Sequence, residues 1–107
     1  MTTFDKREEA FEQKFAHDEE MRFRAHARRN RLVGLWAAHK LGLDGVAADA
    51  YASQVVTADL DRPNSDAVAR KLRQDFDAKG IVQSDHQINR TMEEMMAKAI
   101  EEIKAGH

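Results

Sequence analysis

The sequence predicts an all-α protein, a four-helix bundle whose first helix is much longer than the other three. Between residues 5 and 41 there is no proline and only one glycine, Gly34. In the rest of the chain apolar residues recur three or four positions apart, as on one face of a helix, and no long stretch alternates with the period of two that marks a strand. A length of 107 residues suits a single domain.

The first helix is expected to run from residue 5 to residue 41, because this segment is rich in good helix formers. Gly42 follows it and suits the left-handed position just after a helix end. A helix of about 37 residues would span roughly 55 Å, about twice the length of its neighbours. Only its second half is expected to join the bundle core, through one stripe of side chains, Leu32, Leu35, Trp36 and His39.

The second helix is predicted to begin after Asp44, which serves as its N-cap, and to end near Asp61. Its predicted apolar face consists of Ala47, Ala50, Tyr51, Gln54, Val55 and Ala58. The chain's one proline, Pro63, marks the next break, and Asn64 or Ser65 can cap a third helix.

The third helix is predicted to end at Gly80, and its apolar stripe has regular i+4 steps, Val68, Leu72 and Phe76. Ser84 and Gln87 match a capping box, in which each side chain accepts from the other residue's backbone N–H, so a fourth helix should begin there. Its predicted core face consists of Ile88, Met92, Met95, Met96, Ala99 and Ile103. Short connections between four helices predict an antiparallel arrangement.

Composition excludes several classes of protein. Without cysteine the chain can form neither a disulfide nor a thiolate zinc site. No apolar run approaches the length of a membrane span, and the acidic N-terminus is not a secretory signal, so we expect a cytoplasmic protein without membrane insertion. No histidine pair has the i, i+4 spacing of a metal site, and no serine lies in a nucleophile motif, so we predict no enzyme, metal or cofactor.

The N-terminal segment places three phenylalanines in a highly charged stretch, FDKREEAFEQKFAHDEE. Phe4, Phe11 and Phe15 are spaced by seven and four residues, which puts them on one stripe of a helix. We therefore divide the chain into an N-terminal arm, residues 1–20, and a bundle, residues 21–107. The arm is expected to be a mobile extension of the first helix that binds in a partner's groove. In the alternative it folds back onto the bundle.

The second unusual segment is RFRAHARRNR, which follows the arm. Residues 21–43 contain six basic and no acidic side chains, whereas the flanking segments 4–20 and 44–107 each carry a net charge of −4. The segment contains five arginines that could bind an anion or the phosphates of a nucleotide, Arg22, Arg24, Arg28, Arg29 and Arg31. In the structural alternative these arginines pair with the acidic later helices. Nucleic acid is not expected as a partner, because aromatic residues are scarce here and the whole chain is acidic.

The arm sequence, together with ARRNRLVGLWAAHKLGL, AYASQVV and SDHQINRTMEEMM, resembles the zeta subunit family of alphaproteobacterial ATP synthases. The likeness extends over the whole chain. It implies a four-helix bundle whose N-terminal arm enters the catalytic interface between the alpha and beta subunits of the ATP synthase head, near the gamma stalk. There the arm becomes helical and blocks rotation in the direction of ATP hydrolysis.

On this resemblance the protein is an inhibitor of ATP hydrolysis, found in the cytoplasm and held at the inner membrane only through the ATP synthase. Phe4, Phe11 and Phe15 are expected to fill apolar recesses of the partner. Four charged side chains are expected to contact its rim, Arg7, Glu8, Glu12 and Lys14. The alternative function is a regulatory helical module that binds a nucleotide or another anion, weakly, through the Arg22–Arg31 segment.

Overall fold

The computed structural model describes residues 19–62 and 66–106. These residues form four α-helices: α2 (Glu19–Lys40), α3 (Gly45–Asp61), α4 (Ala67–Ala78) and α5 (Asp85–Lys104). Within the described ranges there is no β-strand, so the all-α prediction is confirmed. The expected extension of the first helix toward residue 5, and with it the whole stripe of phenylalanines, lies outside the described residues.

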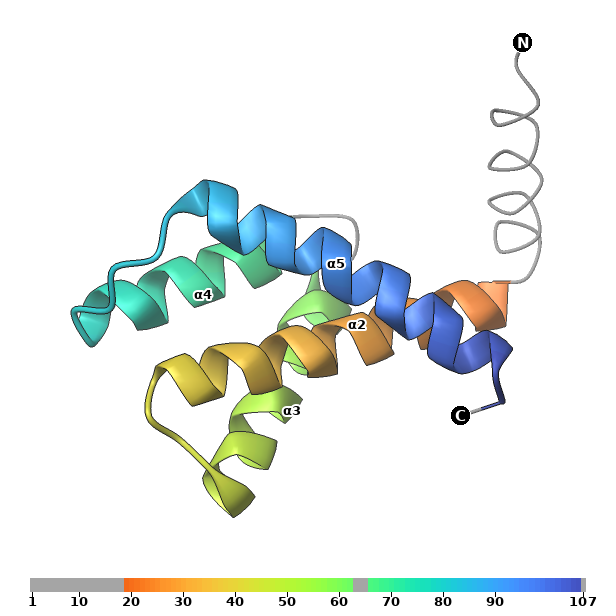
Figure 1. The fold of residues 1–107 in the computed structure, drawn as a ribbon, viewed down its shortest axis with the longest axis horizontal. Coiled ribbons are helices and arrows are strands. Elements are labelled where there is room, and N and C mark those ends of the chain that lie inside the picture. Colours follow the sequence, from red (N-terminus) through yellow and green to blue (C-terminus); the bar gives the residue numbers. More distant parts are fainter. Residues whose placement is uncertain (1–18, 63–65, 107) are drawn as a thin grey trace, which may run out of the picture.

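The helices contact one another in a ring, α2 with α3, α3 with α4, α4 with α5 and α5 with α2. In Figure 1, α5 runs antiparallel to α2, and its C-terminal half lies over the first half of that helix. The most extensive contacts are those of α2 with α3 and α5. The core lies inside this ring, and its largest fully buried side chains are Phe76, Leu72, Ile88, Val33, Val55 and Val68.

Local signals place the helix ends as predicted. Gly42 has a φ of 82°, and the N–H of Leu43 donates to the carbonyl oxygen of Ala38 at 2.8 Å, which closes the end of α2. Gly80 has a φ of 69° after α4. Glycine is favoured at both positions because a side chain would strain this left-handed backbone conformation.

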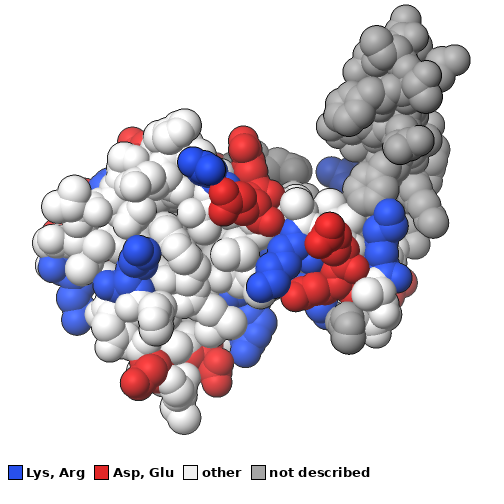
Figure 2. Space-filling view, in the orientation of Figure 1, with Lys and Arg blue, Asp and Glu red and all other residues white. Residues whose placement is uncertain are grey.

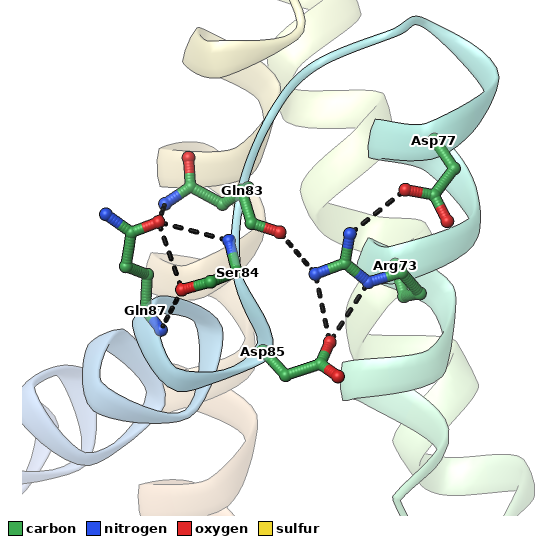
Figure 3. A network of polar contacts seen from close by, with 6 residues as sticks. All are labelled: Arg73, Asp77, Gln83, Ser84, Asp85 and Gln87. Atoms are coloured by element: carbon green, nitrogen blue, oxygen red, sulfur yellow. Dashed lines mark hydrogen bonds and ion pairs between the residues drawn. The ribbon is translucent and has the colours of Figure 1, made fainter.

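The predicted capping box begins α5. Ser84 Oγ accepts from the N–H of Gln87 at 3.1 Å, and Gln87 Oε1 accepts from the N–H of Ser84 at 3.1 Å. Figure 3 shows this pair beside Arg73 of α4, whose guanidinium contacts Asp77, Asp85 and the carbonyl oxygen of Gln83. Arg73 therefore ties α4 to the start of α5 across their connection.

The N-cap of α3 is the predicted residue, whereas the N-cap of α4 differs from the prediction. Asp44 occupies the N-cap position of α3 with extended backbone, but its side chain makes no capping hydrogen bond. The N-cap of α4 is Asp66, not Asn64 or Ser65, and its carboxylate instead pairs with Arg70 at 3.0 Å. Both helices are held mainly by packing of their apolar faces, which makes a capping bond less necessary.

The apolar faces of α4 and α5 are confirmed. Val68, Leu72 and Phe76 are fully buried, and Trp36 of α2 packs edge-on against the Phe76 ring at a centroid distance of 5.8 Å. On α5, Ile88, Ala99 and Ile103 are buried, and two of the three predicted methionines, Met92 and Met95, pack against the core.

The predicted faces of α2 and α3 are partly wrong. On α2, His39 is exposed, and the buried face consists of smaller residues: Val33, Gly34, Ala37 and Ala38. On α3, Ala47, Ala50 and Gln54 are exposed, whereas Ala52 is buried beside Tyr51 and Val55. The reason is a close helix contact: a Cβ atom added to Gly34 would lie 2.7 Å from the Cα atom of Ala52. Small residues, not the largest apolar ones, therefore form this interface.

A polar contact links α3 to α4 at the edge of the core. The hydroxyl of Tyr51 donates to Asp75 Oδ2 at 2.7 Å, and Lys71 Nζ donates to the same oxygen at 3.0 Å. Burial, together with the hydrogen bond to Asp75, raises the pKa of Tyr51 above its usual range. The hydrogen bond between Tyr51 and Asp75 fixes the position of α4 next to α3.

Candidate functional site

The predicted site residues fall into two groups, of which the structure describes one. The arm residues lie outside the described part of the chain: Phe4, Arg7, Glu8, Phe11, Glu12, Lys14 and Phe15. The five arginines all lie on α2, between its fourth and thirteenth residues. The helix directs them to different neighbours, so they do not form a single anion site.

Two of the arginines pair with acidic residues of other helices, as the structural alternative predicts. Arg28 Nη1 lies 3.3 Å from Glu102 Oε1 on α5, and Arg31 Nη2 lies 3.3 Å from Asp49 Oδ1 on α3. Both pairs are partly exposed, so each contributes at most about 1 kcal/mol. In Figure 2, basic and acidic side chains lie next to one another over this end of the molecule, and they do not form a continuous basic patch.

Arg22 and Arg29 instead line a cavity of about 560 Å³, together with His26 of the same helix. The opposite wall comes from the last turns of α3 and includes Val56, Asp59 and Leu60. We call this space the α2–α3 cavity. Arg24 faces a second, more open groove of about 770 Å³ that it shares with Arg28 and Arg31.

A buried amide lies at the α2–α3 cavity, and sequence reasoning missed it. Asn30 is only 1% exposed and lines the cavity. Its Oδ1 accepts from Arg29 Nε at 3.0 Å, but its buried Nδ2 has no hydrogen-bond partner. Buried polar groups are almost always paired, because an unpaired donor costs about 1–3 kcal/mol. A signal was present in the sequence, since Asn30 precedes Val33, Gly34 and Ala37 on the same buried face of α2.

Electrostatics at the cavity favour a neutral histidine. Burial lowers the pKa of His26, and the charges of Arg29 and Arg22 lower it further, while Asp59 opposes them. Burial also lowers the pKa of Arg29, again opposed by Asp59. The charges lining the cavity balance, two arginines against the carboxylates of Glu19 and Asp59.

The rim of the cavity is apolar and open to solvent. Phe23 is 58% exposed and Leu60 is 48% exposed, and they are two of the four exposed large apolar side chains among the described residues. The arrangement can therefore receive a group that combines an apolar surface with a hydrogen-bond acceptor. Phe23 is the one aromatic residue of the RFRAHARRNR segment, and the sequence alone indicated no role for it.

The described residues contain no cluster of three or more side chains that could hold a metal ion. Of the serines considered as nucleophiles, Ser84 acts as the cap of α5, and Ser53 lies on an exposed part of α3. No helix within the described ranges is long and apolar enough to cross a membrane. The described residues thus form a small all-helical protein with an open cavity between α2 and α3.

Comparison with known proteins assigns the chain to a family. The family model of the ATPase inhibitor subunit zeta matches residues 1–102. The chain therefore belongs to the ATPase inhibitor subunit zeta family, as the resemblance of its sequence predicts. This family name indicates inhibition of an ATPase, which is a regulatory role, and implies interaction with ATP synthase.

One solved structure, a protein determined by solution NMR, is 38% identical in sequence to this chain. The alignment covers 81% of this chain and 99% of that protein, with a TM-score of 0.71. Three chains of solved structures match in all. A comparison with curated proteins found no match.

Proposed function

We propose that this protein inhibits ATP hydrolysis by the rotary ATP synthase. In this proposal the N-terminal arm, residues 1–20, inserts as a helix between the alpha and beta subunits of the catalytic head, near the gamma subunit, and blocks rotation. The observation that carries the proposal is the family match, which begins at residue 1 and therefore includes the arm with its three phenylalanines. The protein acts by obstruction and catalyses no reaction of its own.

The energetics of the arm fit insertion into a groove. Burying a phenylalanine contributes about 1.5–3 kcal/mol, so Phe4, Phe11 and Phe15 together contribute roughly 5–9 kcal/mol. Ordering a backbone residue costs about 1–2 kcal/mol, so the three rings alone do not offset the ordering of the whole arm. The remainder comes from two sources. The arm directly precedes α2 in the sequence, so α2 can supply the helix nucleus when the arm becomes helical, and four charged residues contact the rim, Arg7, Glu8, Glu12 and Lys14.

The bundle, residues 21–107, serves as the anchor of the arm outside the interface. The protein is then cytoplasmic and reaches the inner membrane only through its partner. The expected partner subunits are alpha, beta and gamma of the catalytic head.

The test is ATP hydrolysis by the purified cognate catalytic head with added protein. The full chain should inhibit, and a chain that begins at Glu20 should not. Phe11→Ala in the full chain should weaken inhibition at least tenfold, because one buried ring is lost. Val82→Ala is the control, since Val82 is 96% exposed in the connection between α4 and α5 and should not contact the head. If the full chain does not inhibit, the proposal is wrong.

A second candidate function is a nucleotide- or anion-binding module that uses the arginines of α2. One observation favours it, since Arg22 and Arg29 line the α2–α3 cavity together with the unpaired amide of Asn30. Arg28 and Arg31 favour it less, because they already pair with carboxylates. Simultaneous Arg28→Ala and Arg29→Ala substitutions would abolish regulation if this function is correct. They would leave insertion of the arm intact if it is not.

A further inference from the structure

The α2–α3 cavity has a feature that insertion of the arm does not use. Asn30 Nδ2 is buried, has no partner, and belongs to a side chain that lines an open space of about 560 Å³. Its amide orientation is held by Arg29, which donates to Oδ1. Within the described residues this donor has no acceptor, although buried donors are almost always paired.

The charges of the cavity indicate the class of ligand. Arg22 and Arg29 are balanced by Glu19 and Asp59, and burial favours the neutral form of His26. A phosphate chain with several negative charges would meet two carboxylates as well as two arginines, so this balance gives it little net attraction. A neutral or singly charged acceptor, such as a peptide carbonyl or a side-chain oxygen, matches the balance better.

The rim indicates that the acceptor belongs to a polypeptide. Phe23 and Leu60 present exposed apolar surface on either helix beside the polar floor. An apolar side chain between them and an oxygen on Asn30 Nδ2 would together use both parts of the cavity. Such pairing of an apolar anchor with a few oriented polar groups is typical of peptide-binding sites.

The position of the cavity indicates which polypeptide. Its α2 wall runs from Glu19 to Asn30, so it lies within about 17 Å of the point where the arm joins the helix. If the arm inserts into the ATP synthase head, this end of the bundle must face the surface of the head. The opposite end of the bundle, with the α4–α5 connection, must then face away (Figure 1).

We infer that the α2–α3 cavity is a second docking site for the ATP synthase head. It receives an exposed segment of the head that places an apolar side chain between Phe23 and Leu60 and an oxygen at the polar floor. A small shift of the Asn30 side chain on binding then brings its buried Nδ2 to this oxygen. This inference rests on the proposed function and extends it, because two linked contacts bind more tightly than either one alone. The bundle then contributes directly to affinity and orients the arm.

The first experiment maps contacts of the full chain on the purified head. A photo-crosslinking benzoylphenylalanine replaces Phe23 in one chain and Val82 in a matched chain, since both positions carry exposed apolar side chains on opposite ends of the bundle. The Phe23 position should crosslink to one segment of the head, identified by mass spectrometry, at least tenfold more than the Val82 position. Equal crosslinking, or none from Phe23, would overturn the inference.

The second experiment measures affinity for the head with Asn30→Asp, which keeps the shape and the acceptor for Arg29 but replaces the donor by an oxygen. Asn89→Asp is the control, because this substitution makes the same chemical change at an exposed position of α5. Asn30→Asp should weaken binding about tenfold and Asn89→Asp should not. If both variants bind like the unmodified chain, the cavity is not a docking site. If Asn30→Asp fails to fold, the crosslinking result decides.

The outcomes separate this inference from the proposed function. Inhibition without crosslinking at Phe23 would overturn the docking site and leave insertion of the arm standing. Crosslinking at Phe23 without inhibition would overturn insertion and leave the docking site. No binding to the head would overturn both. Saturable binding of ATP alone, detected by NMR at the side-chain amide of Asn30, would overturn the docking site and show that the ligand of the cavity is a nucleotide.

Discussion

The two halves of α2 have opposite properties, although they belong to one continuous helix. The second half packs tightly through Val33, Gly34, Ala37 and Ala38 against its neighbours. The first half buries only Ala25 and Asn30 and otherwise lines open cavities with arginines and an exposed phenylalanine. The comparison indicates that the second half supplies most of the tight packing, whereas the first half, although α5 also contacts it, keeps side chains that line open cavities.

The largest expected effect comes from removing a phenylalanine ring beside each half of α2: Phe76 of α4, which packs against Trp36 in the second half, and Phe23 in the first half. Phe76→Ala removes a fully buried ring that Trp36 contacts edge-on, so it should destabilise the protein by about 3–5 kcal/mol. Phe23→Ala at the cavity rim should change the free energy of unfolding by no more than about 0.5 kcal/mol. Urea denaturation followed by circular dichroism measures both values. Similar losses from the two variants would contradict the comparison.

A smaller effect is expected at the close contact between α2 and α3. Gly34→Ala should destabilise the protein by about 1–3 kcal/mol, although alanine favours helix, because the new Cβ would lie 2.7 Å from the Cα atom of Ala52. Ala47→Gly on the exposed face of α3 serves as the reference, since it reports the ordinary propensity difference of about 1 kcal/mol. A stabilising Gly34→Ala variant would mean that the two helices are not in close contact. Denaturant midpoints with unchanged m-values provide the test.

The contact between α3 and α4 should contribute about 1 kcal/mol. Tyr51→Phe removes the hydrogen bond to Asp75 and leaves the Lys71 contact in place, so the loss is that of one hydrogen bond. The raised pKa of Tyr51 also predicts the pH dependence. The stabilisation should be complete below the usual tyrosine pKa, near pH 10, and should be lost as the pH rises above it.

Tyr51 is the chain's only tyrosine, so an ultraviolet absorbance titration reports on it alone. Ionisation in the folded protein should be shifted to higher pH than in urea. An unshifted titration would contradict the buried hydrogen bond.

The smallest expected effect on stability comes from His26 at the α2–α3 cavity. The pKa of His26 is lowered by burial and by Arg29, so the unfolded chain binds a proton more readily than the folded one. The stability is therefore complete above the unfolded pKa, near pH 6.5, and declines as the pH falls below it toward the lower folded pKa. Thermal unfolding between pH 7 and pH 5 should show a shallower decline for His26→Gln. A decline for His26→Gln as steep as that of the unmodified chain would contradict the lowered pKa of His26.

Much of the fold could be read from local signals. The capping box of Ser84 and Gln87, the glycines after α2 and α4, and the i+4 stripe of Val68, Leu72 and Phe76 all define features within one or two helical turns. The physics of these signals is local, because a cap or a left-handed turn depends on neighbouring residues. The family resemblance was likewise legible in the sequence, and it carries the proposed role of the arm.

The sequence by itself thus determined the four helices of the described residues, the approximate ends of the later three, and the family. Only the tertiary structure decided which face of α2 and of α3 is buried, because small residues such as Gly34 and Ala52 select it through close approach and not through hydrophobicity. It also decided the partners of Arg28 and Arg31, which lie on other helices far along the chain. The unpaired amide of Asn30 belongs to the same group, since a missing partner can be recognised only when every neighbour is in place.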